Sequence, residues 1–248
     1  MSGRVRFSLV RSGGVTMAAS EYTTRRLGIL YDDEWVGAVS AEWLQPEFWR
    51  LRGAIQAELG GRGTARVVDT PAGAAVLRRY HRGGLVARLV QDRYLFTGFE
   101  RSRAWREWRV LHALHERGLP VPRPLMASCE RRGPAYRAGL LTCLIPGAQP
   151  LSEVAETLSE TDWQRLAWTL DAFFAYGVEH VDLNAGNVLC DALGRWYLVD
   201  FDRARLHPGR IRPARMLARL DRSLTGFGIT GAGARLAAVL QSENDSSR

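Results

Sequence analysis

The sequence contains no lysine: its 248 residues include 34 basic side chains, and every one of them is arginine. A site that binds phosphate must therefore be built from guanidinium groups, which bind oxyanions bidentately, in place of ammonium groups. Cysteine is scarce too, with three widely spaced residues and no C-x-x-C spacing. Neither a zinc site nor a disulfide framework is indicated, and we expect reduced thiols.

Long apolar runs are missing as well. No run approaches the roughly 18 residues that a bilayer-spanning helix needs. Near the start the only hydrophobic core is Phe7-Ser8-Leu9-Val10, which is too short for a secretory signal. Met17 is a second possible start of translation. The composition, 46% hydrophobic and 24% charged, is typical of a soluble globular protein.

The charge is strongly positive. A formal net charge of +8 favours an anionic partner such as nucleic acid, phosphate groups or an acidic membrane surface. Charge alone does not choose among these partners, and the sequence indicates no oligomeric state.

The most informative motif is His-Val-Asp-Leu-Asn-Ala-Gly-Asn at positions 180–187, followed by Asp-Phe-Asp at 200–202. It matches the pattern H-x-D-L-x-x-x-N at every fixed position. Phosphoryl transfer needs a base aimed at the acceptor hydroxyl and oxygen ligands that hold Mg²⁺ on the nucleotide. Asp182 is the candidate base, and Asn187 and Asp200 are the candidate magnesium ligands. Either fragment alone would be typical of a polar loop, and an inactive kinase-like protein is the stronger alternative.

The spacing between the two fragments predicts a hairpin. Residues 188–190 and 196–199 are typical of short strands, and residues 191–194 are typical of a turn. Such a hairpin would carry the chain out and back, so that Asp200 returns beside Asn187.

The N-terminal half predicts a second set of phosphate-binding groups. We expect a helix over residues 46–59, then a glycine-rich turn at 60–64, then strands over 65–69 and 74–80. In the turn, Gly61 and Gly63 would let backbone amides approach phosphate, although such a turn is more often only a turn. The second strand carries Arg78 where a kinase has the lysine of V-A-I-K.

A helix over residues 102–117 offers a partner for that arginine. Its apolar side chains, Trp105, Trp108, Leu111 and Leu114, recur at helical spacing. Glu107 lies on the same helix and would pair with Arg78, as a helix glutamate pairs with the strand lysine in kinases. The alternative is a surface residue four positions from Arg103.

These segments together predict an α+β fold of the protein-kinase-like bilobal type. We expect a small β-rich N-lobe over residues 21–144 and a mainly helical C-lobe over 145–240, with nucleotide between them. A stiff connector at 120–124 and a buried strand over 136–144 would precede a hinge at 145–147. Residues 1–20 are expected to be a loose extension, and residues 241–248 a disordered tail.

Two further segments belong to the C-lobe. Residues 161–176 predict an amphipathic helix whose aromatic side chains, including Trp163, Phe173 and Phe174, form core. Residues 205–222 are rich in arginine and carry a narrow leucine stripe. This segment either lies against an anionic lipid surface or packs on the lobe with its charges in water, and the second interpretation is slightly favoured.

With these segments in place, the chain resembles the 3-deoxy-D-manno-octulosonic acid (Kdo) kinases of the lipopolysaccharide kinase group. The resemblance covers roughly residues 45–225. One departure is Phe173-Phe174, where such kinases often have Leu-His. This difference is expected to affect side-chain packing and not catalysis. The matching stretches are Glu47-Phe48-Trp49, Gly61-Arg62-Gly63-Thr64, Leu77-Arg78 with Tyr80 and Arg82-Gly83-Gly84, Asp92-Arg93-Tyr94, Pro120-Val121-Pro122, the 180–187 motif and Asp200-Phe201-Asp202.

The resemblance implies ATP-dependent, Mg²⁺-assisted phosphorylation of the 4-hydroxyl of Kdo on a lipid A precursor, Kdo-lipid IVA. It implies a peripheral protein on the anionic cytoplasmic face of the bacterial inner membrane. On this reading Asp182 is the base, and Asn187 and Asp200 hold magnesium. The groups expected at the ATP phosphates are Gly61, Gly63, Arg78 and Glu107. Arg82-Gly83-Gly84 is a candidate, on its chemistry alone, for the carboxylate or phosphates of the acceptor.

Two rival functions stay open. The first is a kinase for another hydroxyl, either a lipopolysaccharide heptose or a small molecule such as an aminoglycoside or choline. The second is a non-catalytic, basic nucleic-acid-binding or scaffold protein on a kinase-like fold. The filled motif positions and the lack of a nucleic-acid recognition module argue against it, so we expect no nucleic-acid partner.

Overall fold

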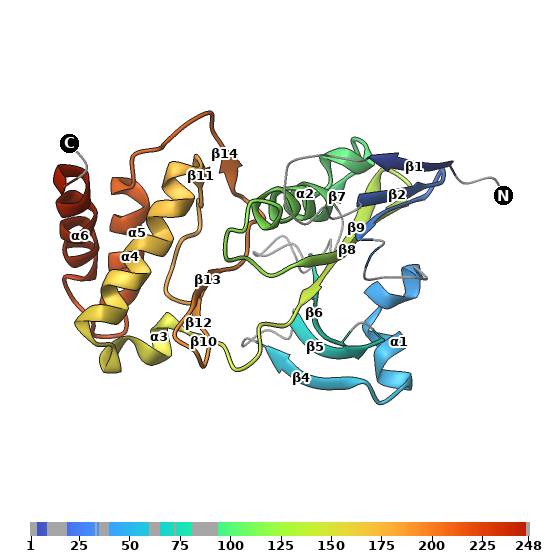
Figure 1. Cartoon of the computed structure of the whole chain (residues 1–248). Coiled ribbons are helices and arrows are strands. Elements are labelled where there is room, and N and C mark those ends of the chain that lie inside the picture. Colours follow the sequence, from blue (N-terminus) through green and yellow to red (C-terminus); the bar gives the residue numbers. More distant parts are fainter. Residues whose placement is uncertain are drawn as a thin grey trace. The chain divides into compact units, whose positions relative to one another are not determined.

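The computed structural model describes residues 4–8, 19–32, 34, 40–59, 65–71, 73–80 and 94–246. The chain divides into two compact units. The first comprises Met1–Glu116 and Arg123–Leu144, and the second comprises Arg117–Pro122 and Ile145–Arg248. Strands dominate the first unit and helices the second (Figure 1), so the predicted α+β class is confirmed.

An antiparallel sheet forms the first unit. Over the described residues its strands run in the order β1-β2-β3-β8-β9-β6-β5-β4, and β7 also pairs with β9. The strands predicted over residues 65–69, 74–80 and 136–144 are present as β5, β6 and β9. The bounds are β1 (Arg4–Ser8), β2 (Ala19–Thr23), β3 (Leu27–Asp32), β4 (Ile55–Leu59), β5 (Ala65–Thr70), β6 (Gly73–Arg79), β7 (Tyr94–Leu95), β8 (Pro124–Arg132) and β9 (Ala135–Cys143).

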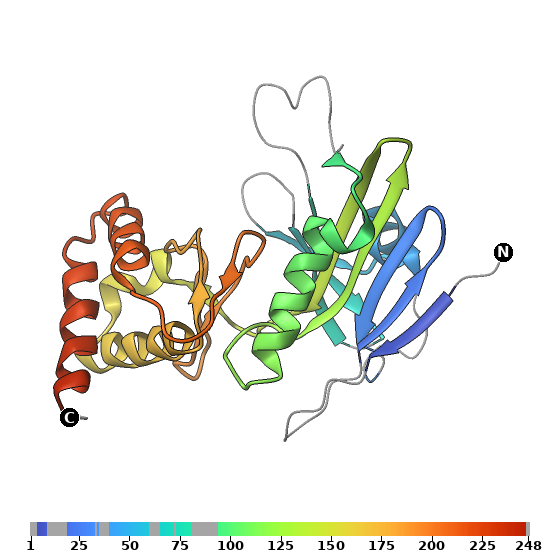
Figure 2. The same ribbon diagram turned by 90° about the horizontal axis from the view of Figure 1, so that it is seen from above.

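One face of this sheet is covered by α2 (Arg103–His115), which follows the 3-10 turn η3 (Phe99–Arg101) and packs across β8 and β9 (Figure 2). The side chains of Trp105, Trp108, Leu111 and Leu114 are buried, as their helical spacing predicts. Gly28 on β3 allows the close approach, because a Cβ there would lie 2.8 Å from the ring of Trp105.

The opposite face has a core of its own. Leu77 on β6 belongs to a buried cluster that includes Leu44 of the 3-10 turn η1 (Ala41–Leu44) and Trp49 of α1 (Pro46–Leu51). Neighbouring residues of a strand point to opposite faces. Since Leu77 enters this core, Arg78 is placed on the face that α2 covers.

The helix predicted over residues 46–59 is wrong in its second half. The helix α1 ends at Leu51, and residues 55–59 form β4, which pairs with β5. Gly53, with φ of +63°, turns the chain in a left-handed conformation that stops the helix. The apolar spacing is shared by two elements, because Trp49 belongs to the helix and Ile55 opposes Val68 in the sheet.

The loose extension predicted over residues 1–20 is also wrong in part. Residues 4–8 form β1, which pairs with residues 19–23 of β2 in an antiparallel ladder. Arginine alternates with apolar residues in Arg4-Val5-Arg6-Phe7, the period of a strand. That short pattern was a usable signal for a strand.

The second unit combines helices with short strands (Figure 1). One small sheet has the order β10-β12-β13, and β11 pairs with β14. The bounds are β10 (Gln149–Pro150), α3 (Leu151–Val154), η4 (Ala155–Thr157), α4 (Glu160–Ala175), β11 (Val178–Glu179), β12 (Val188–Cys190), β13 (Trp196–Leu198), β14 (Arg205–Leu206), α5 (Ala214–Thr225) and α6 (Ala232–Ser246).

The helix α4 realises the amphipathic helix predicted over residues 161–176. Ser159 and Asp162 form a capping box that fixes its start. Its apolar face is buried over its whole length, including Trp163, Phe173 and Phe174. The aromatic residues are core, as predicted.

The C-terminal helices decide the interpretation of the arginine-rich segment. Helix α6 packs against α4 and α5. On α5 the apolar side chains of Met216, Leu217, Leu220 and Leu224 are buried. The leucine stripe is therefore part of the core, as the slightly favoured interpretation held. Helix α6 continues to Ser246, so the disordered tail predicted over residues 241–248 is wrong up to that residue.

No helix among the described residues has both the length and the apolar character to span a bilayer.

Candidate active site

The motif at positions 180–187 forms a tightly bonded loop between β11 and β12. The amide of Leu183 donates to the carbonyl of His180 at 3.1 Å, and the amide of Asn187 donates to the carbonyl of Asn184 at 3.0 Å. The side-chain amides of Asn184 and Asn187 both donate to the carbonyl oxygen of Asp182 at 2.9 Å. These two hydrogen bonds hold the backbone of Asp182 in place. They do not involve its carboxylate.

His180 anchors this loop to the Asp-Phe-Asp segment. Its buried ring bonds through Nε2 to the carbonyl of Val199 at 3.0 Å and packs on the ring of Phe201, with 4.8 Å between centroids. Burial lowers the pKa of His180. The contact requires a proton on Nε2, while buried Nδ1 has no hydrogen-bond partner among the described residues. The ring is therefore a neutral donor.

The hairpin predicted between the two fragments is confirmed. Strands β12 and β13 pair with Val188 opposite Leu198, and the amide of Val199 donates to the carbonyl of Asn187 at 3.0 Å. The chain therefore reaches Asp200 one residue after the position opposite Asn187.

The turn of this hairpin is held by Asp191. Its Oδ1 accepts from the amides of Leu193 and Arg195 at 2.9 Å, and its Oδ2 accepts from Nε of Arg195 at 2.8 Å. Burial alone would raise the pKa of Asp191, but these hydrogen bonds outweigh burial and lower it. Gly194 closes the turn with φ of +72°. A fixed turn keeps the two ends of the hairpin in register.

Asp200 itself has an unusual backbone. Its φ is +66°, and it is the only residue other than glycine with a positive φ in the part of the chain that the structure describes. The next residue, Phe201, is buried against His180 and lies 6.2 Å from Phe173 between ring centroids. A left-handed residue that surrounding packing enforces is common at functional sites. Phe173, where the resemblance departs, thus fills the core below this segment.

Asn187 and Asp200 supply oxygen atoms of the kind that Mg²⁺ prefers. The Nδ2 of Asn187 is used by the loop, and this leaves its Oδ1 as the remaining polar atom of that side chain. Among the described residues no group of three or more His, Cys, Asp or Glu side chains is arranged so that it could hold a metal ion by itself. Two protein oxygens fit a magnesium ion that takes its other ligands from phosphates and water.

Asp182 has two arginine partners that the sequence did not indicate. Nη2 of Arg219, on α5, donates to Oδ1 of Asp182 at 2.8 Å. Nη1 of Arg203 lies 3.7 Å from Oδ2 of the same carboxylate. The candidate base therefore lies between two positive charges.

The pairing predicted between Arg78 and Glu107 is present in the first unit. Nη2 of Arg78 and the hydroxyl of Tyr80 both donate to Oε2 of Glu107, whose side chain is only 2% exposed. Nη2 of Arg78 also lies 3.3 Å from the hydroxyl of Tyr80. Burial, reinforced by the charge of Glu107, raises the pKa of Tyr80 well above its ordinary value. Glu107 is therefore no surface residue.

Three of these residues were missed as parts of a site. Tyr80 is two positions from Arg78, and residues at this spacing share one face of a strand. That spacing could have identified it. Arg219 has no such local signal, because its proximity to Asp182 depends on how α5 packs. Arg203 follows the Asp-Phe-Asp segment directly, but it matches no position of the motif. The predicted Gly61 and Gly63, and the Arg82-Gly83-Gly84 stretch, lie outside the described residues.

Comparison with known proteins adds the family. Residues 46–240 match the model of the lipopolysaccharide kinase (Kdo/WaaP) family. A 3-deoxy-D-manno-octulosonic acid kinase of Stenotrophomonas maltophilia (strain R551-3) is 40% identical over 198 residues, which cover 79% of each chain. Proteins of the same name from Xanthomonas axonopodis pv. citri and Xanthomonas campestris pv. campestris (strain B100) are 42% and 41% identical over the same share of each chain.

Proposed function

The chain belongs to the lipopolysaccharide kinase (Kdo/WaaP) family of kinase-like phosphotransferases with hydroxyl acceptors, and we propose that it phosphorylates the 4-hydroxyl of Kdo on a lipid A precursor, Kdo-lipid IVA. The phosphoryl donor in this proposal is ATP. The observation that carries the proposal is the hydrogen-bonded loop with Asp182 at its centre, in a chain whose relatives are named 3-deoxy-D-manno-octulosonic acid kinases.

In the proposed reaction Asp182 is the general base. Its carboxylate accepts the proton of the acceptor hydroxyl while that oxygen attacks the γ-phosphorus of ATP. The bond from the γ-phosphorus to the bridging oxygen breaks, and ADP leaves. The two amide bonds to the Asp182 carbonyl support this role, because a base acts only when it is held within hydrogen-bond distance of the hydroxyl.

Asn187 and Asp200 would hold magnesium in this proposal. A bound magnesium ion would neutralise charge that develops on the phosphate oxygens. The chain's own contribution is the hairpin, which sets these two residues at adjacent positions, and the anchor that His180 provides through Val199.

Arg78 would bind the ATP phosphates. Its guanidinium is oriented by Glu107 and Tyr80, and its side chain is 22% exposed. A buried carboxylate fixes the planar fork, so less conformational entropy is lost when a phosphate binds. Glu107 is then a positioning residue. Gly61 and Gly63 remain candidates for the same phosphates through their backbone amides.

A transfer assay tests the proposed function. Purified protein with Mg²⁺ and ATP is incubated with Kdo-lipid IVA, with a heptosylated lipopolysaccharide core or with choline, and products are identified by mass spectrometry. We expect one added phosphate on the Kdo acceptor alone. Turnover only on the heptosylated core or on choline would instead assign the chain to the rival kinase function. ATP-independent, steeply salt-dependent DNA binding without transfer would favour the scaffold function.

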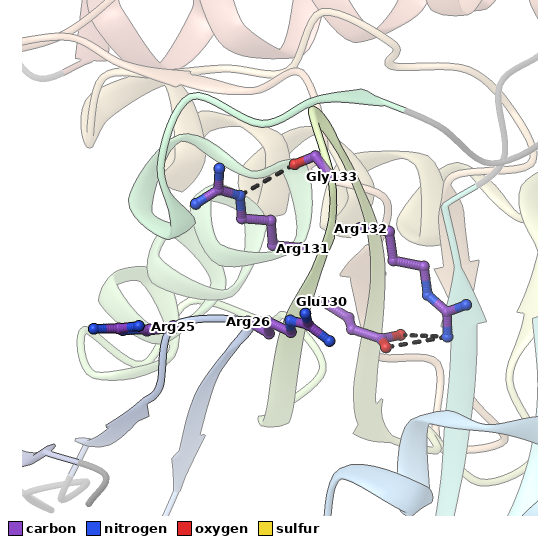
Figure 3. Close-up of a pocket in the computed structure, with 6 residues that line it drawn as sticks. All are labelled: Arg25, Arg26, Glu130, Arg131, Arg132 and Gly133. Atoms are coloured by element: carbon purple, nitrogen blue, oxygen red, sulfur yellow. Dashed lines mark hydrogen bonds and ion pairs between the residues drawn. The ribbon is translucent and has the colours of Figure 1, made fainter. Parts of the chain in front are cut away.

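We also propose that the protein works as a peripheral protein on the anionic cytoplasmic face of the inner membrane. The support comes from one end of the first unit, where the β2–β3 and β8–β9 turns meet through a bond of 2.7 Å from the Arg131 amide to the Arg26 carbonyl. Four arginines, one glutamate and one glycine line a cavity of about 730 Å³ there (Figure 3). We call this surface the arginine end; its arginines are Arg25, Arg26, Arg131 and Arg132.

The arginine end has the chemistry of a surface that binds anionic lipid. Its single acid, Glu130, pairs with Arg132 at 3.1 Å, which leaves a formal excess of three positive charges from four arginines and one glutamate. Leu95 is 72% exposed and pairs with Ala135 beside the same turn. A cluster of basic residues next to an exposed apolar side chain suits the interface of an anionic bilayer.

Vesicle sedimentation tests this second proposal. We expect binding to vesicles that contain phosphatidylglycerol and none to phosphatidylcholine alone. Changing all four arginines to glutamine should weaken binding about a thousandfold, since each contributes about 1 kcal/mol near such a surface and about 1.4 kcal/mol is tenfold in affinity. The control changes Arg50 and Arg52, which lie on α1 and after it and are exposed as well. Equal binding by both variants would contradict the proposal.

A further inference from the structure

Arg219 and Arg203 contact the carboxylate of Asp182, which the proposed reaction needs as its base. Arg219 donates to Oδ1 of Asp182 at 2.8 Å, and Arg203 lies 3.7 Å from Oδ2. The hydrogen bond from Arg219 takes up a lone-pair direction of Oδ1 that the acceptor hydroxyl would otherwise use, and Arg203 adds an ion pair at Oδ2. Holding the base in place does not require them, because Asn184 and Asn187 already clamp its backbone.

The position of Arg219 is built into the fold. Its helix α5 is held in place by the buried side chains of Met216, Leu217 and Leu220. One turn after Arg219, the hydroxyl of Ser223 accepts a hydrogen bond of 3.1 Å from the amide of Ala185 in the loop. Residues four apart share a helix face, so the face of α5 that carries Arg219 is bonded directly to the loop. The guanidinium at Asp182 is thus set by packing.

We infer that Arg219 and Arg203 bind the carboxylate of the acceptor sugar and release Asp182 to act on the hydroxyl. This inference rests on the proposed function, in which the acceptor is a sugar acid. In Kdo one methylene separates the carbon that bears the carboxylate from the carbon that bears the 4-hydroxyl. With carbon–carbon bonds of about 1.5 Å, the two groups lie roughly 4–5 Å apart. An acceptor hydroxyl at Asp182 therefore places its carboxylate within reach of both guanidinium groups.

The exchange explains why a carboxylate on the acceptor would be recognised beside the reacting hydroxyl. A guanidinium that leaves Asp182 keeps an anionic partner, because the acceptor carboxylate replaces the protein carboxylate. An acceptor without that charge would have to break the Asp182 contacts and leave both arginines without a counter-ion. Arg219 and Arg203 are then specificity-determining residues for the acceptor, and the arginine-only composition suits this bidentate role.

The test compares two acceptors in two variants. The acceptors are the Kdo-lipid and its analogue in which the carboxylate is a neutral carboxamide. The variants are Arg219→Gln and Arg203→Gln. The matched control is Arg210→Gln, because Arg210 pairs with Asp171 at nearly the same exposures, 42% and 27% against 44% and 29% for Arg219 and Asp182. Circular dichroism and thermal unfolding verify that all variants are folded.

We expect the wild type to prefer the carboxylate acceptor by about 10-fold to 100-fold in kcat/KM, the range of a charge-assisted contact. In Arg219→Gln the preference should fall toward one, through a higher KM for the carboxylate acceptor, with KM for ATP unchanged. Arg219→Lys should restore part of the preference for the carboxylate acceptor, and Arg210→Gln should leave that preference unchanged. A preference that survives in both glutamine variants, with both acceptors slowed equally, would show that the arginines only position Asp182. If the wild type transfers to neither acceptor, the proposed function itself has failed.

Discussion

Glu107 on α2 accepts hydrogen bonds from Arg78 on β6 and from Tyr80 two residues later, through one carboxylate oxygen. The carboxylate is 2% exposed, while Arg78 keeps 22% of its side chain exposed. A buried charge of this kind is tolerable only when it is paired and hydrogen-bonded. In a chain without lysine, the pair holds a guanidinium where other kinases hold an ammonium group.

Changing Glu107 to Gln should raise KM for ATP about 10-fold with a smaller effect on kcat. The substitution keeps a hydrogen-bond acceptor and removes the charge that orients Arg78, and a charge-assisted bond is about twice as strong as a neutral one. Steady-state kinetics with varied ATP measures this. The control is Glu47→Gln, which removes an exposed pair with Arg50 in the same unit. An unchanged KM for ATP in Glu107→Gln would contradict the role given to Arg78.

Changing Asp200 to Asn should raise the Mg²⁺ concentration for half-maximal activity by about 10-fold or more, because the hard cation loses a charged oxygen ligand. Asn187→Ala should act in the same direction. Titration of activity with Mg²⁺ at fixed ATP measures both. Asp171→Asn, which removes an acid paired with Arg210 on the surface, should leave the titration unchanged. Identical titrations for all three variants would remove Asn187 and Asp200 from the metal site.

Gly177 should not tolerate alanine. It follows α4 with φ of +82°, and a Cβ there would lie 2.1 Å from the carbonyl oxygen of His207. A left-handed alanine costs roughly 1–2 kcal/mol, and the clash adds about 1–3 kcal/mol. Gly209 has φ of +76° with open space around it, so Gly209→Ala should cost only the first amount. Urea unfolding compares the two, and equal losses would contradict the close approach.

Stability should fall as the pH is lowered from about 7.5 to 5.5. Burial lowers the pKa of His180, so the unfolded chain takes up a proton near its ordinary value of about 6.5 while the folded chain does not. One such group changes the free energy of unfolding by at most about 1.4 kcal/mol per pH unit. His180→Gln should make this pH dependence shallower but should not abolish it, because burial also lowers the pKa of His115. Urea unfolding at several pH values gives the slopes, and an unchanged slope in His180→Gln would refute the assignment.

Local patterns were enough to predict much of this fold. The hairpin after Asn187 and the buried face of α4 depend on short-range periodicity and turn residues, and both are present. The pair of Arg78 and Glu107 was predicted from the kinase pattern, in which a helix glutamate pairs with the strand lysine. Residues 46–59 were harder, since one apolar spacing served a helix up to Leu51 and a strand from Ile55, with only Gly53 between them.

The partners of Asp182 show the limit of such reasoning. Arg219 is one of several arginines in its segment, which also contains Arg210 and Arg222. Sequence composition does not distinguish Arg219 from the other two. Only the packing of α5 on the loop, through Ser223 and Ala185, selects Arg219. Non-local contacts of this kind leave no periodic signal in the chain, so a motif identifies the candidate base but not the side chains that contact it.

The most direct test is phosphoryl transfer from ATP to Kdo-lipid IVA by the wild type and by Asp182→Asn, with nucleotide binding measured on the same samples. Loss of a general base costs about 10²-fold to 10⁴-fold in rate. We predict a loss of that size in Asp182→Asn with unchanged affinity for ATP, and a phosphorylated Kdo product from the wild type. Equal transfer rates for the two proteins would contradict the role of Asp182 on which the account depends.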